Sequence, residues 1–139
     1  MSSTVARRVA AGLAVVYAGC AAFIVFWPSS TPSSDSVNVM TEGLYGLGFP
    51  DWISRSMVEF AANIALFVPL SLLGSVLLDR WGWKFWLLAG LAASGAIELG
   101  QLLFLGGRSA TVVDVVANTL GAVAGAVVAG ALRTRLPDS

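Results

Sequence analysis

Three apolar stretches of the sequence each contain an acidic residue and an amide residue three or four positions apart. The pairs are Glu59 with Asn63, Glu98 with Gln101, and Asp114 with Asn118. Residues at these spacings share one face of a helix. Carboxylates act as general acid–base groups or bind cations, and amides select polar groups of a ligand. The pattern therefore predicts three helical faces that carry chemistry.

The three pairs fall at a similar depth if each stretch crosses a membrane. Glu59 and Asp114 would lie about 3 Å inside the outer ends of their spans, and the other four residues would lie within roughly 10 Å of those ends. Acids inside a membrane face a bundle interior or a wet cavity, because contact with lipid is costly. We therefore expect the three pairs to line one outward-facing cavity.

Seven residues are candidates for ligand binding: Glu59, Asn63, Glu98, Gln101, Arg108, Asp114 and Asn118. Arg108 lies between the last two stretches and would meet phosphate or carboxylate at the rim of the cavity through paired hydrogen bonds. The carboxylates of Glu98, Asp114 and Glu59 are the candidate catalytic groups, since the sequence has no His and no recognised nucleophile arrangement. A simpler alternative is that the acids and amides only join helices through hydrogen bonds.

The composition places these residues in a membrane. Hydrophobic residues make up 57% of the 139 residues and charged residues only 12%, about half the charged fraction of a soluble domain. Four stretches have the length of roughly 20 residues that a membrane-spanning helix needs. They are residues 9–27, 58–78, 85–105 and 112–132. We expect an all-α, polytopic membrane protein: a single domain over residues 1–139, built as a bundle of four transmembrane helices.

Basic residues indicate the orientation of the four spans. If the N-terminus is cytoplasmic, six basic residues fall on the inner side (Arg7, Arg8, Arg80, Lys84, Arg133 and Arg135), and two fall on the outer side (Arg55 and Arg108). Such a bias predicts that both termini are cytoplasmic. The first stretch also resembles a signal peptide, but its apolar run continues past Cys20 to Trp27, which favours a span.

The segment between the first two spans has two parts. Residues 28–38 are rich in Ser, Thr and Pro, and we expect a flexible outer loop there. Residues 41–56 include Tyr45, Phe49 and Trp52, and such aromatic residues favour the membrane interface. We therefore predict an interfacial outer segment before the second span.

The last span also carries a packing motif. Asp114, Asn118, Gly121 and Gly125 follow one helix face, and the two glycines allow close approach of a second helix. We expect them to touch another span, either within the chain or in a homo-oligomer. The other expected partners are membrane lipids. Nothing suggests nucleic-acid binding, because no basic tract occurs, and the sequence indicates no metal and no cofactor.

The ordered set of motifs resembles the VanZ-like membrane protein family. Glu59 and the segment from Asn63 to Leu70 look like its early motif, and the segments from Ser94 to Gln101 and from Asp114 to Gly121, with Arg108 between them, look like its later motifs. The resemblance covers residues 58–125. The chain departs from it at Thr111, where many members carry a further Asp, so a mechanism that needs two acids in this loop is in doubt.

Membership of this family implies a multi-pass protein of a bacterial cell membrane, with a role in the cell envelope. The family's eponymous member is linked to low-level resistance to teicoplanin, a glycopeptide antibiotic. We expect the cavity to bind an envelope lipid, an envelope precursor or a glycopeptide-like ligand. Two alternatives remain: an outer-leaflet enzyme in which carboxylates perform acid–base chemistry or hold a divalent cation, and a small transporter or subunit of an assembly.

Overall fold

In the computed structural model, residues 3–26, 30–104 and 111–135 are described, and within them the chain forms helices and no strand. The helices are α1 (Ser3–Val25), α2 (Ser30–Gly46), α3 (Arg55–Leu77), α4 (Trp83–Phe104) and α5 (Val112–Arg135). All of them except α2 contain a stretch long and apolar enough to cross a membrane. The predicted all-α fold with four membrane-spanning helices is therefore confirmed.

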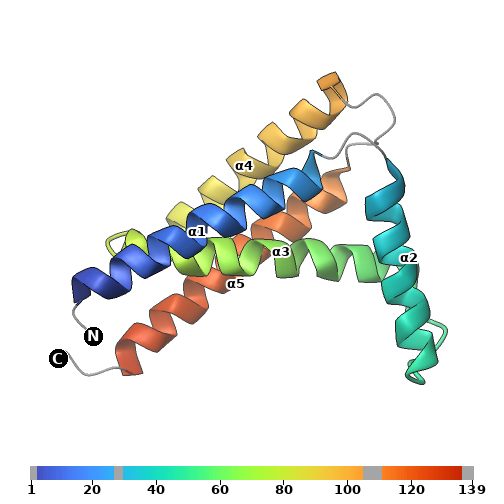
Figure 1. The fold of residues 1–139 in the computed structure, drawn as a ribbon, viewed down its shortest axis with the longest axis horizontal. Helices are drawn as coiled ribbons and strands as arrows, with labels where there is room; N and C mark the ends of the chain where they lie inside the picture. The colour runs from blue at the N-terminus through green and yellow to red at the C-terminus, as the bar shows by residue number, and fades with distance from the viewer. Residues whose placement is uncertain (1–2, 27–29, 105–110, 136–139) are drawn as a thin grey trace.

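The segment expected to be a flexible loop is helical. We predicted a loop over residues 28–38, but α2 begins at Ser30 and continues to Gly46. Pro32 does not prevent this, because the first backbone N–H groups of a helix have no partner within the helix and proline is tolerated there. The loop prediction was therefore wrong for the part that α2 covers. α2 runs across the end of the bundle that lies opposite the start of α1 (Figure 1).

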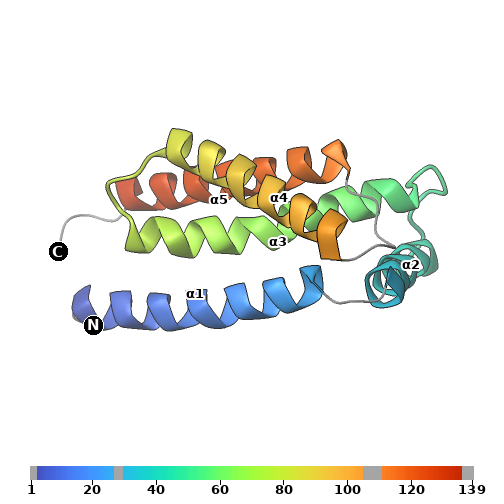
Figure 2. The ribbon, with the colours of Figure 1, turned by 90° about the horizontal axis from the view of Figure 1, so that it is seen from above.

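The four long helices run between the same two ends of the bundle, with α3 crossing the others at an angle (Figure 1), and α5 packs against both α3 and α4 (Figure 2). α1 lies along α3, on the side of α3 that faces away from α5 (Figure 2). The start of α1, the turn from α3 to α4 and the end of α5 lie together at one end of the bundle, which we call the basic end (Figure 1). The start of α3, the end of α4 and the start of α5 lie near the opposite end, which we call the polar end.

Glycine allows α5 to approach α3 closely. A Cβ atom on Gly121 would lie 2.8 Å from the Cβ atom of Phe67, and it would also clash with a backbone carbonyl of α3. A Cβ atom on Gly125 would collide with the hydroxyl of Ser71 and the carbonyl oxygen of Val68. The expected contact of these glycines with another span is therefore confirmed within one chain. Association of two copies through the same residues stays a prediction.

Small polar side chains occupy the interior of the bundle. The largest side chains that are almost fully buried are those of Ser71, Ser75 and Ser94. Gly90 on α4 fits against α5 in the same way, since a Cβ atom there would lie 2.8 Å from the Cβ atom of Ala122. Lipid tails are as apolar as leucine, so helices in a membrane associate through close packing and hydrogen bonds rather than through hydrophobic burial. The small residues of these interfaces suit that form of association.

Candidate functional site

The polar end contains a hydrogen-bond network that joins three helices. The amide Nδ2 of Asn63 on α3 donates a hydrogen bond of 2.7 Å to Oδ1 of Asp114 on α5. The hydroxyl of Thr111, just before α5, donates to Oδ2 of the same carboxylate at 2.6 Å. The backbone N–H of Thr111 donates in turn to Oε2 of Glu98 on α4 at 3.0 Å. We call these four residues the polar cluster: Asn63, Glu98, Thr111 and Asp114.

Thr111 is the residue that connects the two carboxylates. It is the N-cap of α5, and its hydroxyl accepts a hydrogen bond of 3.2 Å from the backbone N–H of Asp114. In a capping box, the acid at the third helical position reaches back to the backbone N–H of the cap residue. Here Glu98 of the neighbouring helix takes that N–H, and Asp114 instead accepts from the Thr111 hydroxyl and from Asn63. Side chains of α3 and α4 thus hold the start of α5, Glu98 through the backbone N–H of Thr111 and Asn63 through the carboxylate of Asp114.

Sequence reasoning missed the role of Thr111. The sequence analysis named this residue only as a position where many members of the similar family carry an Asp. The pattern Thr111-Val-Val-Asp114 at the start of an apolar run is, however, a capping-box signature. That signal was sufficient to place Thr111 at the start of the helix, beside Asp114. It did not indicate that Glu98 would complete the cap from another helix.

Asn118 lies one helical turn deeper than Asp114. Its Nδ2 donates a hydrogen bond of 2.9 Å to the hydroxyl of Ser94 on α4, and both side chains are buried. The Oδ1 atom of Asn118 is buried as well, and no described residue donates a hydrogen bond to it. Asn118 therefore joins α5 to α4 below the polar cluster and keeps one acceptor atom unpaired within the described part of the chain.

Gln101 points to a different neighbour. It is buried, and its Nε2 donates a hydrogen bond of 3.0 Å to the carbonyl oxygen of Val25 at the end of α1. The last carbonyls of a helix lack partners within the helix, so this contact satisfies one of them. Gln101 thus holds α1 to α4, although it shares a predicted helix face with Glu98. Only one residue of that pair joins the polar cluster.

The two remaining candidates for ligand binding are Glu59 and Arg108. Glu59 lies one turn from Asn63 on α3, is partly exposed, and forms no hydrogen bond or ion pair with a described residue. Arg108 lies outside the described residues. Within the described ranges, no three acidic or thiol side chains gather closely enough to hold a metal ion. The three-carboxylate cation site considered from the sequence is therefore not formed by these residues.

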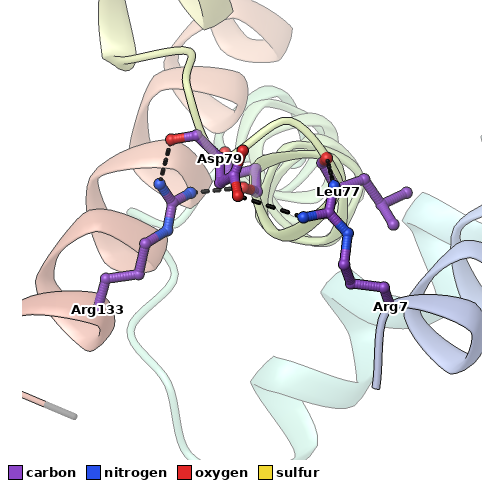
Figure 3. A network of polar contacts seen from close by, with 5 residues as sticks. Arg7, Leu77, Asp79 and Arg133 are labelled. Atoms are coloured by element: carbon purple, nitrogen blue, oxygen red, sulfur yellow. Dashed lines mark hydrogen bonds and ion pairs between the residues drawn. The ribbon is translucent and has the colours of Figure 1, made fainter. Parts of the chain in front are cut away.

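A second polar arrangement, at the basic end, was not predicted. Arg7 of α1 donates to the carbonyl oxygen of Leu77 at 2.8 Å and to the carboxylate of Asp79 at 3.2 Å (Figure 3). From the other side, Arg133 of α5 donates to the backbone carbonyl of Asp79 at 2.8 Å and to the carbonyl of Ser75 (Figure 3). Cations stabilise the end of a helix, where carbonyls are unpaired and the dipole is negative. These two arginines form a clamp on the end of α3.

Comparison with known proteins agrees with the resemblance that the motifs indicate. A model of the VanZ/LLP1 family matches residues 14–133. This range includes the four residues of the polar cluster, Asn118, and the whole of α3 and α4. No curated protein and no solved structure matches the chain. The matched segment is most of the chain and begins within α1. This multi-pass membrane protein therefore belongs to the VanZ/LLP1 family.

Proposed function

We propose that this protein binds a molecule of the bacterial cell envelope at the polar end of the bundle. The observation that carries the proposal is the polar cluster, which links α3, α4 and α5 through two carboxylates and neutral donors. Burying ionisable groups in a membrane is costly, and such groups mark functional sites more often than chance packing. A bundle held together by amides alone would avoid that cost.

Three further features support binding at this end. Glu59 has a partly exposed carboxylate that no described residue engages, one turn beyond Asn63. Asn118 keeps a buried acceptor atom that a ligand or a water molecule would satisfy. Arg108, in the connection between α4 and α5, would meet a phosphate or carboxylate of the same ligand. Gln101 would act by fixing α1 beside the site rather than by touching the ligand.

The ligands that we propose are lipid headgroups, lipid-linked envelope precursors and glycopeptide-like compounds. In this view the polar end faces outward, both termini are cytoplasmic, and α2 lies at the outer interface. The family's link to teicoplanin resistance suggests that such binding reduces the action of that antibiotic. The carboxylates of Glu59, Glu98 and Asp114 would contact amine or hydroxyl groups, since carboxylates accept hydrogen bonds.

Native mass spectrometry of the full chain in mild detergent tests the binding. We expect a co-purified envelope lipid or precursor on the wild-type protein, and less of it on Glu59→Gln, which removes a charge without removing a described contact. Glu42→Gln is the matched control, because Glu42 is an exposed acid of α2, the helix that runs across the same end of the bundle (Figure 1). Ligand occupancy that is equal in the wild type, Glu59→Gln, Glu98→Gln and Asp114→Asn would contradict the proposal.

The proposed role in resistance has its own test. Bacteria that express the wild-type protein should tolerate more teicoplanin than bacteria that carry the empty vector. Glu98→Gln should abolish the difference while protein levels in the membrane stay the same, and Glu42→Gln should preserve it. If the wild-type protein leaves the inhibitory concentration unchanged, the resistance role is wrong, whatever the binding experiment shows.

A further inference from the structure

The basic end of the bundle collects most of the cations that the structure describes. Five basic residues surround the turn from α3 to α4 or lie on the helix ends beside it: Arg7, Arg8, Arg80, Lys84 and Arg133. The described acidic residue of this region is Asp79. The sequence treats these five cations alike, as markers of the cytoplasmic side. The structure divides them into two groups.

Arg7 and Arg133 form hydrogen bonds within the protein. Each donates two hydrogen bonds to the end of α3 or to Asp79, so their guanidinium groups compensate the unpaired carbonyls and the one carboxylate of this region (Figure 3). The clamp also fixes the start of α1 beside the turn from α3 to α4. Cations carried by α1 and by that turn are thereby held at the same end of the bundle.

Arg8, Arg80 and Lys84 form the second group, which we call the free cations. All three side chains are exposed, and none donates a hydrogen bond to a described residue. Arg8 follows Arg7 on α1, and Arg80 follows Asp79, so the contact between Arg7 and Asp79 brings the backbone of these two neighbours to the same end of the bundle. Lys84 lies at the start of α4, with its Nζ atom 5.9 Å from the ring centre of Trp83.

Two tryptophans mark the depth of this surface. Trp81 and Trp83 are 52% and 49% exposed; Trp81 follows Arg80 in the turn, and Trp83 is the first residue of α4, next to Lys84. Exposed tryptophans flanking apolar helices sit at the level of the lipid headgroups, where an indole ring is partly hydrated. This preference predicts that the free cations lie at the level of lipid phosphates. Phosphate accepts hydrogen bonds from Arg and Lys, and exposed basic residues at this depth attract anionic lipids.

We propose that Arg8, Arg80 and Lys84 form a binding site for anionic phospholipid headgroups, flanked by Trp81 and Trp83. This site is separate from the one at the polar end and does not depend on it. The clamp of Arg7 and Arg133 holds the site together without contacting the lipid. Its ligand is a lipid of the leaflet at the basic end, so the protein would engage both surfaces of the membrane through different chemistry.

Thermal unfolding of the full chain in mild detergent tests this site. Phosphatidylglycerol added to the micelles should raise the Tm of the wild-type protein more than phosphatidylcholine does, and high salt should remove the difference because it screens exposed charges. The triple variant Arg8→Gln/Arg80→Gln/Lys84→Gln should lose this selectivity. Each exposed cation contributes about a fivefold gain in affinity for an anionic surface, so the triple variant should bind on the order of 100-fold more weakly.

Arg55→Gln is the matched control, because Arg55 is an exposed arginine at the other end of the bundle. It should retain the selectivity for phosphatidylglycerol. The single variant Arg80→Gln should lose part of it, which covers the case in which the triple variant folds poorly. Equal stabilisation of the wild type by both lipids would overturn the proposal, as would full selectivity in the triple variant. Loss of selectivity in Arg55→Gln would show a general charge effect and would also overturn the proposal. The same holds for stabilisation by inorganic phosphate alone, which would show an ion site instead of a lipid site.

Discussion

Asn63 and Asp114 lie 51 positions apart in the sequence, yet the amide of the first donates a hydrogen bond of 2.7 Å to the carboxylate of the second. This contact joins α3 to α5 at the polar end. The same carboxylate accepts the hydroxyl of Thr111, so both of its oxygens are engaged. The contact is therefore part of a network whose members should be energetically coupled.

A double-mutant cycle would measure that coupling. Asn63→Ala and Asp114→Ala should each lower the free energy of unfolding, and the double variant should lose less than the sum of the two. We expect a coupling free energy of about 1 kcal/mol, the order found for hydrogen bonds within membranes. Unfolding in mixed micelles with increasing denaturing detergent provides the measurement. Asn63→Ala combined with Asn118→Ala should be additive, because Asn118 bonds Ser94 instead; equal coupling in both cycles would contradict the assigned partners.

Thr111 offers a test of the shared cap. Thr111→Val removes the hydroxyl that accepts from the N–H of Asp114 and donates to its carboxylate, so it should lower stability by about 1 kcal/mol, the usual cost of losing an N-cap. Thr111→Ser keeps the hydroxyl and should remain near the wild type. Thermal unfolding of both variants in the same detergent would show the difference. A serine variant as unstable as the valine variant would mean that packing, and not capping, is what Thr111 supplies.

The glycines of α5 allow a comparison within one helix. Gly125→Ala should lower the free energy of unfolding by roughly 1–3 kcal/mol, because the added methyl group would collide with Ser71 and Val68. Gly130→Ala meets nothing within 4 Å, and it should be neutral or stabilising by up to about 1 kcal/mol, since alanine favours a helix. The same unfolding assay serves both. Equal effects of the two substitutions would show that the close approach of α3 and α5 is not required.

The two groups of basic residues should respond differently to substitution. Arg133→Met removes two hydrogen bonds to carbonyls at the end of α3, and we expect it to lower the Tm clearly in detergent without added lipid. Arg8→Met removes no hydrogen bond to a described residue and should leave that Tm within experimental error. If the two variants unfold at the same temperature, the clamp contributes nothing to stability.

The orientation in the membrane can be tested by cysteine labelling in a Cys20→Ser background, because Cys20 is the one cysteine of the sequence. Leu47→Cys, at a position that is 79% exposed and directly follows α2, should react with a membrane-impermeant thiol reagent in whole cells. Gly82→Cys, at the turn of the basic end, should react only after the membrane is permeabilised. The opposite result for both positions would reverse the predicted orientation.

The sequence predicted the four spans well, since apolar runs of sufficient length determine which helices cross a membrane. It did not predict α2, because residues 30–38 are rich in Ser and Thr, and a polar composition near a proline does not distinguish a loop from a surface helix. The glycine stripe was identified correctly as a contact surface. Its partner, α3, could not be deduced, because the stripe would suit any neighbour.

The candidate site was predicted in part for a similar reason. Helical spacing correctly placed Asn63 and Asp114 on faces that meet, and it placed Glu98 near them. It also paired Glu98 with Gln101, whose side chain instead reaches Val25 on α1. Two residues that are three positions apart on a helix are neighbours, but they point in directions about 60° apart around the helix axis. Their side chains can therefore contact different neighbouring helices. Which neighbour each one meets depends on the packing of the helices, and the sequence of one helix does not specify that.

The shared cap of α5 also bears on how the protein is made. The side chains of Asn63 and Glu98, which hold the start of α5, are synthesised 51 and 13 residues before their partners Asp114 and Thr111. Membrane helices insert first and then associate. Until α5 has entered the membrane, these two polar side chains have no access to those partners. Biogenesis of the bundle therefore finishes with its last helix. A nascent chain that stopped before Thr111 would lack the partners that Asn63 and Glu98 bind in the finished bundle.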